Sequence, residues 1–421
     1  MSRLAKKIVL SLSVLVFAYV AMGYVLGKTN DDKTYRSLTV FSEVLEHIQH
    51  DYVEDPNMRQ VETGALHGLL DSLDPQSSYL SAREYTDYKG KVDNEAKGGS
   101  GLELSKRFGY VAVISVIPDS PAQKANIRTG DLLESIAGFT TRQMAIGQAQ
   151  VLLSGEPGTA VKVSVIHRGG GEAQDVDLVL AKIPAPKLLE DKLNGDVAYL
   201  RVPTFDRGIT SQIREKLIQM DKQGAHKLIL DLRDCARGQM QEAVSTAQLF
   251  LPSGNITTLR GQTVSSQTFS ADSSKVVWKQ PMTVLISTGT AGPAEVVASA
   301  IADNKRGETV GTTTFGTASE QKVIPLDDGA ALILTVANYF TPGGKSIPAD
   351  GIVPQVEVRP ALDDSGAVNP DQATPQPGQL PSVNDPVMKK AIDILQGNAP
   401  KHAELNKTLE MFRSEAHKRA A

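Results

Sequence analysis

The residues from 284 to 321 constrain the fold of this chain more than any other part of its sequence. Residues 283–286 are a short apolar run, which is typical of a buried strand. Pro293 then opens a helical pattern, and proline suits the first turn of a helix because the N–H groups there have no partner within the helix. A second strand is expected at 308–310, before the dipeptide Phe315-Gly316. This order predicts a strand–helix–strand crossover in an α/β core.

The same stretch resembles the catalytic core of the C-terminal processing (tail-specific) serine peptidases. That family opens the helix with Ser-Ala-Ser-Ala-Ser-Glu and carries Phe-Gly-Lys-Gly further along, with a Gln after the Lys. Aligned on Glu295 and Phe315-Gly316, the nucleophilic Ser of the family falls on Gly292 and its Lys base falls on Thr317. The supporting Gln of the family matches Gln321.

The chemistry that this resemblance implies is missing from the aligned positions. A serine hydrolase needs a hydroxyl group beside a base that takes its proton. Gly292 has no side chain, and Thr317 has no basic nitrogen. In the family, the residue after the nucleophile supplies an amide to the oxyanion hole, but here that residue is Pro293, which has no N–H. We therefore expect no intact catalytic residue.

A second motif departs from the family in the same way. The run KLILDLRD resembles the family's Leu-Ile-Leu-Asp-Leu-Arg-Asn-Asn-Pro-Gly-Gly, and the first Gly of its pair falls on Arg237, followed by Gly238. Asp231 and Arg233 are interpreted as an ion pair or as capping groups. Four hydroxyl residues near the site are interpreted as turn residues, and each is considered as a replacement nucleophile: Ser287, Thr288, Thr290 and Ser319.

Residues 96–184 resemble a PDZ domain over the whole module. Its glycine-rich loop and following strand match the carboxylate-binding turn of such domains, and glycines let successive backbone N–H groups converge on an anion. The run PDSPAQKANIRTGD fits a PDZ signature as well. The resemblance implies a groove for polypeptide C-termini, and a domain kept only as a spacer or interface is the alternative. The expected peptide-binding residues are Gly99, Ser100, Gly101, Leu102, Glu103 and Leu104.

The N-terminus predicts a location. Arg3, Lys6 and Lys7 precede an uncharged run at 8–27, which Lys28 closes. About 20 apolar residues span a bilayer, and flanking positive charge stays on the cytoplasmic side. We expect an uncleaved signal anchor; a cleaved signal peptide and a buried helix are the alternatives. The chain is then a single-pass protein of the bacterial inner membrane, with residues 29–421 periplasmic or extracytoplasmic.

The remaining segments complete the expected organisation. Residues 262–279 are rich in Ser, Thr and Gln and predict a mobile excursion, and 361–382 have the composition of a flexible linker. Cys235 is the only cysteine, so neither an intramolecular disulfide nor a cysteine metal cluster can form. The net charge of −4 does not indicate a nucleic-acid partner, and no cofactor or metal is expected. The expected domains are 1–28, 33–90 (helical), 96–184 (PDZ), 185–360 (peptidase-like core), 361–382 (linker) and 383–421 (helical tail).

The fold class expected from these features is a mixed α/β peptidase core with an inserted PDZ domain and a helical N-terminal segment. The expected function is that of a catalytically degenerate C-terminal processing peptidase, which binds polypeptide C-termini or regulates a partner such as an active paralogous protease. Two alternatives stay open. The first is an active serine-type endopeptidase that uses non-standard residues, and the second is a structural subunit of an envelope complex.

Overall fold

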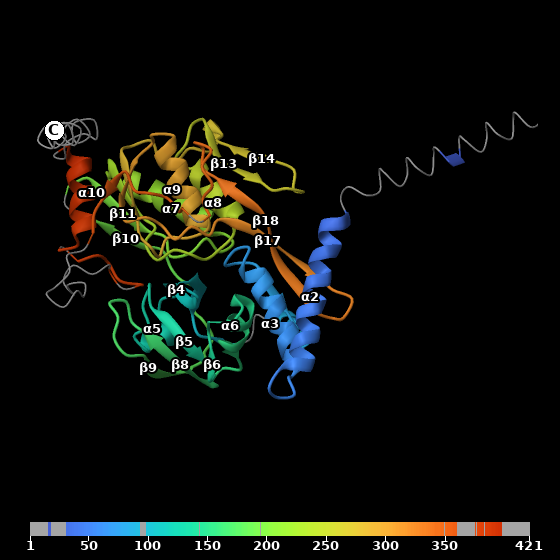
Figure 1. The fold of residues 1–421 in the computed structure, drawn as a ribbon. Helices are drawn as coiled ribbons and strands as arrows, with labels where there is room; N and C mark the ends of the chain where they lie inside the picture. The colour runs from blue at the N-terminus through green and yellow to red at the C-terminus, as the bar shows by residue number, and fades with distance from the viewer. Residues whose placement is uncertain are drawn as a thin grey trace, which may run out of the picture. The chain divides into compact units, whose positions relative to one another are not determined.

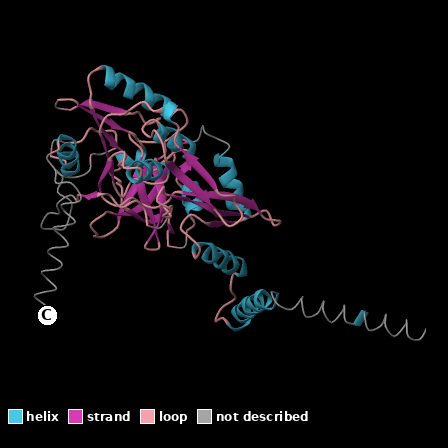
Figure 2. Cartoon of the chain, turned by 90° about the horizontal axis from the view of Figure 1, so that it is seen from above, coloured by secondary structure: helices cyan, strands magenta, loops and turns pink. Residues whose placement is uncertain are grey.

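The computed structural model describes residues 16–17, 31–92, 98–142, 144–193, 195–348, 350–359, 375, 377–382 and 384–397. The chain divides into two compact units, Met1–Ala65 and Leu66–Ala421. Helix α2 (Asp31–Asp51) lies in the first unit, and α3 (Met58–Asp71) begins there. Figures 1 and 2 show α2 and α3 as separate helices joined by a short loop.

Two expectations for the termini fall outside this description. The apolar run at 8–27 lies outside the described residues, apart from 16–17, and so do residues 398–421 of the expected helical tail. Within the described part of the chain, no helix combines the length and the apolar character needed to cross a membrane.

The centre of the second unit is a six-stranded sheet with the order β10-β11-β12-β15-β16-β19, in which all neighbours except β10 and β11 run parallel. Parallel strands buried on both faces read as continuous apolar runs, and β15 is an example because all its residues are buried. The strands are β10 (Leu189–Lys192), β11 (Val197–Arg201), β12 (Lys227–Asp231), β15 (Met282–Ile286), β16 (Glu308–Gly311) and β19 (Val356–Glu357).

Helices cover both faces of this sheet. Because side chains alternate along a strand, Ala198 and Leu200 of β11 join the core under one set of helices, whereas Val197 and Tyr199 face the other side. The first face carries α7 (Ile209–Lys222), α8 (Met240–Gln248) and α9 (Pro293–Asp303). The second face carries α10 (Pro386–Gln396), so the first helix of the C-terminal tail packs on the core.

A second, antiparallel sheet has the order β1-β18-β13-β14, with β17 also paired to β18. β1 comes from the segment expected to be helical, because Ser78, Tyr79 and Leu80 find partners on a strand some 250 residues further along that no local pattern indicates. The strands are β1 (Ser78–Leu80), β13 (Asn255–Arg260), β14 (Gln267–Ser270), β17 (Ser319–Pro325) and β18 (Ala331–Phe340). Helix α4 (Ala82–Val92) follows β1.

The excursion expected at 262–279 is wrong in part. Residues 267–270 form β14, which pairs with β13, and a short 3-10 helix, η1 (Ser273–Lys275), follows. Trp278 is only 1% exposed and belongs to the main core. Polar composition alone indicated mobility, but one large apolar side chain packed into the core holds the end of this segment in place.

The PDZ region forms its own sheet and core. The sheet has the order β3-β4-β5-β8-β9 with β6 paired to β5, and a short β2–β7 pair closes the module. The elements are β2 (Gly98–Gly99), β3 (Leu102–Arg107), β4 (Tyr110–Val116), α5 (Pro121–Lys124), β5 (Leu132–Ile136), β6 (Phe139–Thr140), α6 (Ile146–Leu152), β7 (Ser154–Gly155), β8 (Ala160–Ile166) and β9 (Gln174–Val179). The expected fold class, a mixed α/β core with a PDZ domain and N-terminal helices, is confirmed.

Candidate functional site

Gly292 lies at the turn between β15 and α9. It occupies the position before the first helical residue, Pro293, and its backbone angles are φ 55° and ψ −115°. Residues with a Cβ rarely adopt such a conformation, at a cost of about 1–3 kcal/mol, whereas glycine adopts it readily. The expected helix start at Pro293 is confirmed.

Gly292 and Thr317 lie next to each other. A Cβ atom built on Gly292 would have two neighbours within 4 Å: the carbonyl oxygen of Ala236 at 3.8 Å and Oγ1 of Thr317 at 3.9 Å. Both distances are ordinary van der Waals contacts, so a small side chain at position 292 would fit sterically and lie against the hydroxyl of Thr317.

The carboxylate of Glu295 holds the two sides of this site together. Its Oε2 accepts hydrogen bonds from the backbone N–H of Gly292 (2.8 Å) and of Thr317 (2.9 Å). Its Oε1 accepts from the N–H of Gly316 (2.6 Å) and from Oγ1 of Thr314 (2.5 Å). Complete burial raises the pKa of Glu295 above its ordinary value, and the four donors partly offset that effect.

Gln321 reaches this site only through an intermediate side chain. Its Nε2 donates to Oγ of Ser319 (2.7 Å), and Ser319 donates through its backbone N–H to the carbonyl of Thr317 (2.8 Å). Gln321 itself is exposed on β17, at the point where the pairing with β18 shifts register. Its amide therefore supports the backbone around Thr317 indirectly.

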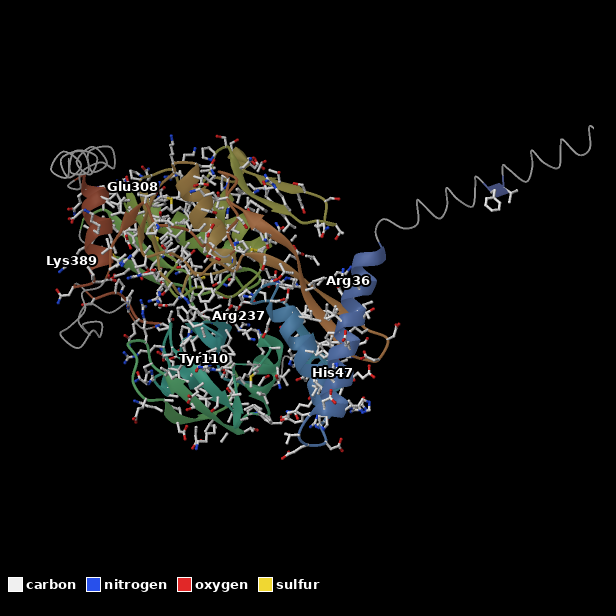
Figure 3. All side chains as sticks on the ribbon, viewed as in Figure 1. Arg36, His47, Tyr110, Arg237, Glu308 and Lys389 are labelled. Atoms are coloured by element: carbon white, nitrogen blue, oxygen red, sulfur yellow. The ribbon has the colours of Figure 1, made fainter. Side chains whose placement is uncertain are left out.

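Gly238, which the sequence aligns with the oxyanion hole of the family, lies on a strained stretch of backbone. Its φ is 125°, and a Cβ there would lie 2.2 Å from the carbonyl carbon of Phe205, so no other residue fits without movement of the backbone. No acceptor within the described part of the chain contacts the Gly238 N–H. Arg237 (Figure 3) directs its guanidinium to the surface, where Nε donates to Asp206 at 3.2 Å.

The hydroxyl groups of Ser287 and Thr290, before Gly292, each accept a hydrogen bond from a backbone N–H of their own turn. Oγ1 of Thr290 donates to the carbonyl of Leu232 (2.8 Å) and accepts from the N–H of Ser287 (3.0 Å). Oγ of Ser287 accepts from the N–H of Gly289 at 3.1 Å. These bonds are those of turn residues, as the sequence indicates.

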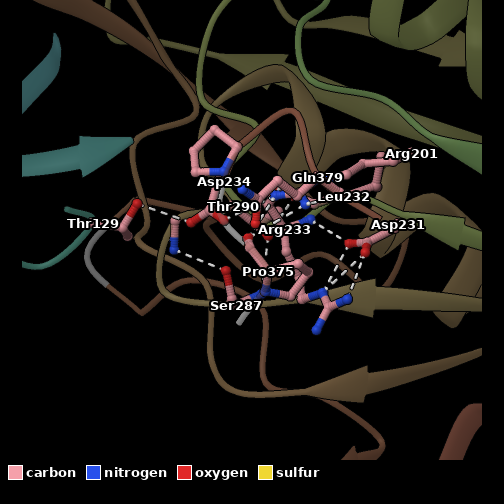
Figure 4. Close-up of polar contacts among 12 residues, drawn as sticks. Thr129, Arg201, Asp231, Leu232, Arg233, Asp234, Ser287, Thr290, Pro375 and Gln379 are labelled. Carbon is pink, nitrogen blue, oxygen red and sulfur yellow. Dashed lines mark hydrogen bonds and ion pairs between the residues drawn. The ribbon is translucent and has the colours of Figure 1, made fainter. Parts of the chain in front are cut away.

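Asp231 and Arg233 form a buried ion pair, which confirms that interpretation (Figure 4). Nη2 of Arg233 lies 2.7 Å from Oδ2 of Asp231, and Nη1 lies 2.6 Å from Oδ2 of Asp385. Burial opposes the ionisation of Asp231, but the charges of Arg233 and Arg201 outweigh it and lower the pKa of that carboxyl. Because Asp385 caps α10, this network ties the C-terminal helix to the end of β12.

Asp234 joins the core to the PDZ domain (Figure 4). Its Oδ1 accepts from Oγ1 of Thr129 (2.9 Å), and its Oδ2 lies 3.1 Å from Nη2 of Arg201. Asp234 has a left-handed backbone, with φ at 55°. Burial raises its pKa, with the charge of Arg201 opposing the shift. Arg201 also donates to the carbonyls of Gln379 (3.2 Å) and Pro375 (3.4 Å), so the segment before α10 crosses this point.

A cavity of about 500 Å³ lies beside the site, between α8, the β13–β14 hairpin and β18. It is close to Thr317, because the backbone N–H of Tyr339 in its wall donates to the carbonyl of Ala318 (3.0 Å). Burial raises the pKa of Tyr339 to about 12, and its hydroxyl donates to Glu320 at 3.3 Å. The walls are mostly apolar: Met240, Val244, Leu259, Val264, Phe269, Val336 and Ala337, with Gln241, Gln267 and Glu320 as polar members.

The PDZ loop differs in one respect from the expected carboxylate site. The N–H of Ser100 donates to the carbonyl of Leu153 (3.0 Å), and the N–H of Gly99 donates to Ala181 (2.9 Å), so these two amides are used inside the fold. Gly101 has a φ of 82°, and no acceptor within the described residues contacts its N–H. The alternation of an antiparallel pair directs the N–H of Leu102 away from β4, toward the open edge of β3.

The other members of the expected set extend along this edge. Leu102 and Glu103 are half-buried at the start of β3, and Leu104 is buried in the PDZ core. The far end of the same strand approaches the site in the core, where the guanidinium of Arg107 lies 5.7 Å from the centre of the Phe315 ring. One edge strand thus runs from the PDZ loop to the loop that contains Thr317.

Several residues of the site were not expected from the sequence. Glu295 served only to align the family motif, although an acidic residue at the third position of a helix is a recognisable capping signal. No local sequence pattern indicates the roles of Thr129 and Asp385. Their partners, Asp234 and Arg233, are 105 and 152 residues away along the chain. No cluster of three or more metal-binding side chains is found within the described residues.

Comparison with known proteins identifies two domains. Residues 196–358 match the model of peptidase family S41, and residues 98–180 match that of a PDZ domain. The carboxy-terminal-processing protease of Bartonella bacilliformis is 32% identical over 352 residues, which cover 82% of this chain and 80% of that protein. The carboxy-terminal processing protease CtpA of Bacillus subtilis is 28% identical over 335 residues, or 79% and 71% of the two chains.

The solved structures agree with this result. The photosystem II D1 C-terminal processing protease superposes with a TM-score of 0.64 at 25% identity, over 78% of this chain and 96% of that one. The chain therefore belongs to peptidase family S41, among the carboxy-terminal processing proteases that carry a PDZ domain.

Proposed function

We propose that this chain is a non-cleaving member of its family that binds the C-termini of polypeptides. The observation that carries the proposal is that Gly292 and Thr317, which the sequence aligns with the Ser and Lys of the family, lie next to each other. Neither residue supplies a nucleophile activated by a base, and Pro293 removes one amide from the oxyanion hole. Three independent losses fall on one site.

Two features support binding without cleavage. In the PDZ domain, the N–H of Leu102 faces the open edge of β3, and the N–H of Gly101 has no acceptor within the described residues. These two amides suit the carboxylate and first residue of an added strand. In the core, the cavity of about 500 Å³ has the apolar walls and few polar groups of a side-chain pocket. A peptide held along β3 would approach the loop that contains Phe315, because Arg107 at the end of that strand contacts it.

The first test combines binding and turnover on the purified full-length chain. Synthetic peptides with an apolar C-terminal residue should bind as free acids in the micromolar range, which corresponds to about 8 kcal/mol. The same peptides with an amidated C-terminus should bind at least about ten-fold more weakly, because the anion is gone. An unstructured substrate protein should keep its full length.

Two results would favour the other candidates. Turnover that survives purification, and that disappears when Ser287, Thr290 or Ser319 becomes Ala, would establish an active endopeptidase with non-standard residues. Equal affinity for free-acid and amidated peptides would mean that the PDZ loop does not receive a carboxylate, and would favour a structural subunit of an envelope complex. A partner protease whose activity changes on addition of the chain would favour the regulatory role.

We also propose that the chain is attached to the bacterial inner membrane by residues 8–27, with the rest outside the cytoplasm. The basic residues before this apolar run support that orientation. Protease added to spheroplasts should digest residues 29–421. Protection until the membrane is lysed would contradict the proposed orientation, and release of a shortened soluble chain would identify a cleaved signal peptide instead.

A further inference from the structure

The cavity between α8, the β13–β14 hairpin and β18 has a carboxylate among its mostly apolar walls (Figure 1). Among the described residues that line it, Glu320 is the only one that carries a charge. Glu320 is exposed near the start of β17 and follows Thr317 by three residues. The cavity therefore adjoins the loop that contains Thr317, and a polypeptide that reaches this loop also meets Glu320.

The carboxylate of Glu320 is only partly satisfied by the chain itself. Its Oε2 accepts a hydrogen bond from the hydroxyl of Tyr339 at 3.3 Å. Tyr339 stays a neutral donor, because burial and then the charge of Glu320 raise its pKa to about 12. Within the described residues, neither oxygen of Glu320 pairs with a basic side chain. A cation is thus the partner that this carboxylate lacks.

One basic residue follows a wall residue of the cavity but faces away from it. Leu259 of β13 pairs with Tyr339 of β18, and both residues line the cavity. Arg260 and Phe340, the next residues on the two strands, point to the opposite face because side chains alternate along a strand. The guanidinium of Arg260 lies 4.8 Å from the centre of the Phe340 ring. Arg260 therefore does not neutralise Glu320.

Apolar, acidic and basic side chains differ in how they suit this cavity. An apolar side chain would contact the walls but cover Glu320, and removing a carboxylate from water without a partner is costly. An acidic side chain would face a like charge. A lysine or arginine side chain has an apolar stem for walls such as Val244 and Leu259, and a cation for Glu320. The differences between these costs select a basic side chain.

We propose that this cavity receives a lysine or arginine side chain of the bound polypeptide, with its stem against the apolar walls and its cation paired with Glu320. This selectivity rests on the proposed function, in which the PDZ domain takes the C-terminal carboxylate. The core then selects, among polypeptides with an apolar C-terminal residue, those with a basic residue at a suitable distance before it.

Peptide binding to the purified full-length chain tests this selectivity. One lysine is moved along an otherwise neutral free-acid peptide with an apolar C-terminal residue. At each position norleucine replaces it in a second peptide, because norleucine resembles the lysine stem without the ammonium group. At one position or a few adjacent ones, lysine should bind about five-fold more tightly than norleucine, which corresponds to about 1 kcal/mol, the upper range for an exposed ion pair.

Variants at two exposed carboxylates identify the group responsible. Glu320→Gln should abolish the preference for lysine and leave the affinity for the norleucine peptide unchanged. Tyr339 keeps an acceptor in this variant, so the urea midpoint of unfolding should stay close to that of the natural chain. Glu320→Lys should favour a peptide with glutamate at the same position. Asp327→Asn is the matched control, because it removes one exposed negative charge from the turn between β17 and β18, outside the cavity walls, and it should keep the preference for lysine.

Three outcomes would overturn the proposed selectivity. Lysine that binds no more tightly than norleucine at any position would mean that Glu320 meets no cation of the ligand. A preference that persists in Glu320→Gln, or that Asp327→Asn removes equally, would mean that the net charge of the chain attracts the peptide. In each case, norleucine peptides that still bind as free acids would leave the proposed function standing. Absence of binding by every peptide would contradict the proposed function and the selectivity together.

Discussion

A Cβ atom built on Gly292 would lie 3.9 Å from Oγ1 of Thr317, so the side chains at these two positions share one small space. The proposed alignment assigns that space to the nucleophile and the base of the family. Here it holds a hydrogen atom on one side and a hydroxyl on the other. The frame around it is intact, because Glu295 accepts hydrogen bonds from the backbone of both residues. The backbone of the site is therefore maintained independently of the side chains that would perform the chemistry.

The first prediction concerns restoration of activity. Gly292→Ser should give no measurable proteolysis, because no base accepts the hydroxyl proton. The variant should also lose about 1–3 kcal/mol of stability, since serine is strained at a φ of 55° although the space is sufficient. Adding Thr317→Lys supplies the base, but Pro293 still withholds an amide whose absence costs about 10²–10³ in rate. Recovery should require Pro293→Ala, and Arg237→Gly tests whether that side chain blocks the substrate.

The measurement is cleavage of an unstructured substrate by the single, double, triple and quadruple variants. A double variant that cleaves as fast as an active relative would mean that the oxyanion is stabilised without the amide of residue 293. Gly238 is then the group to examine, because its N–H has no acceptor within the described residues.

A second prediction concerns Glu295 as the structural centre of the site. Glu295→Gln replaces one carboxylate oxygen with an NH₂ group, which donates hydrogen bonds instead of accepting them. The two groups that donate to that oxygen in the natural chain then lose their acceptor. Each unsatisfied buried group costs about 1–3 kcal/mol, so the variant should lose roughly 2–4 kcal/mol of stability. Glu190→Gln is the matched control, because Glu190 lies at the surface 2.6 Å from Lys216 and such pairs contribute at most about 1 kcal/mol. Urea unfolding compares the two, and equal losses would contradict the role given to Glu295.

A third prediction separates a buried arginine from an exposed one in the same segment. Arg233→Leu leaves the carboxylates of Asp231 and Asp385 buried without their shared cation, which costs about 3–5 kcal/mol. Arg237→Leu removes only an exposed pair with Asp206 and should cost less than about 1 kcal/mol. Arg233→Leu should also increase hydrogen exchange in α10, since Asp385 caps that helix. Unchanged hydrogen-exchange protection of α10 would show that the ion pairs of Arg233 with Asp231 and Asp385 do not stabilise this helix.

The parts that the sequence predicts are those set by local spacing. Apolar periodicity and the position of Pro293 predict β15, α9 and β16. The order of its elements predicts the PDZ module. The ion pair of Asp231 and Arg233 could also be predicted from the sequence, because the two residues are only two positions apart at the end of one strand.

Long-range pairings account for what the sequence could not indicate. β1 pairs with β18 across most of the chain, and Trp278 enters the core from a segment whose composition is that of a loop. The N–H of Ser100 donates to the carbonyl of Leu153 at the C-terminal end of α6, a contact that no glycine pattern in the sequence indicates. In each case the deciding partner is distant in sequence, so neither propensity nor periodicity carries the information.

The last prediction concerns pH and Asp234. Burial raises the pKa of this carboxyl above 3.8, with Arg201 opposing the shift. Between 3.8 and the raised value, the folded chain binds a proton that the unfolded chain has lost, so stability falls as the pH rises through this window. Asp234→Asn cannot titrate and keeps a residue that tolerates the left-handed backbone. Relative to this variant, the natural chain should lose up to about 1.4 kcal/mol per pH unit within the window.

Thr129→Val provides the matched test of the same group. The hydroxyl of Thr129 donates to Asp234 and lowers its pKa, so its removal should raise that pKa further and extend the window to higher pH. The measurement is the urea midpoint of unfolding as a function of pH across the acidic range, for the natural chain, Asp234→Asn and Thr129→Val. If the natural chain instead gains stability relative to Asp234→Asn as the pH rises, the charge of Arg201 outweighs burial. Asp234 is then a stabilising anion that fastens the PDZ domain to the core.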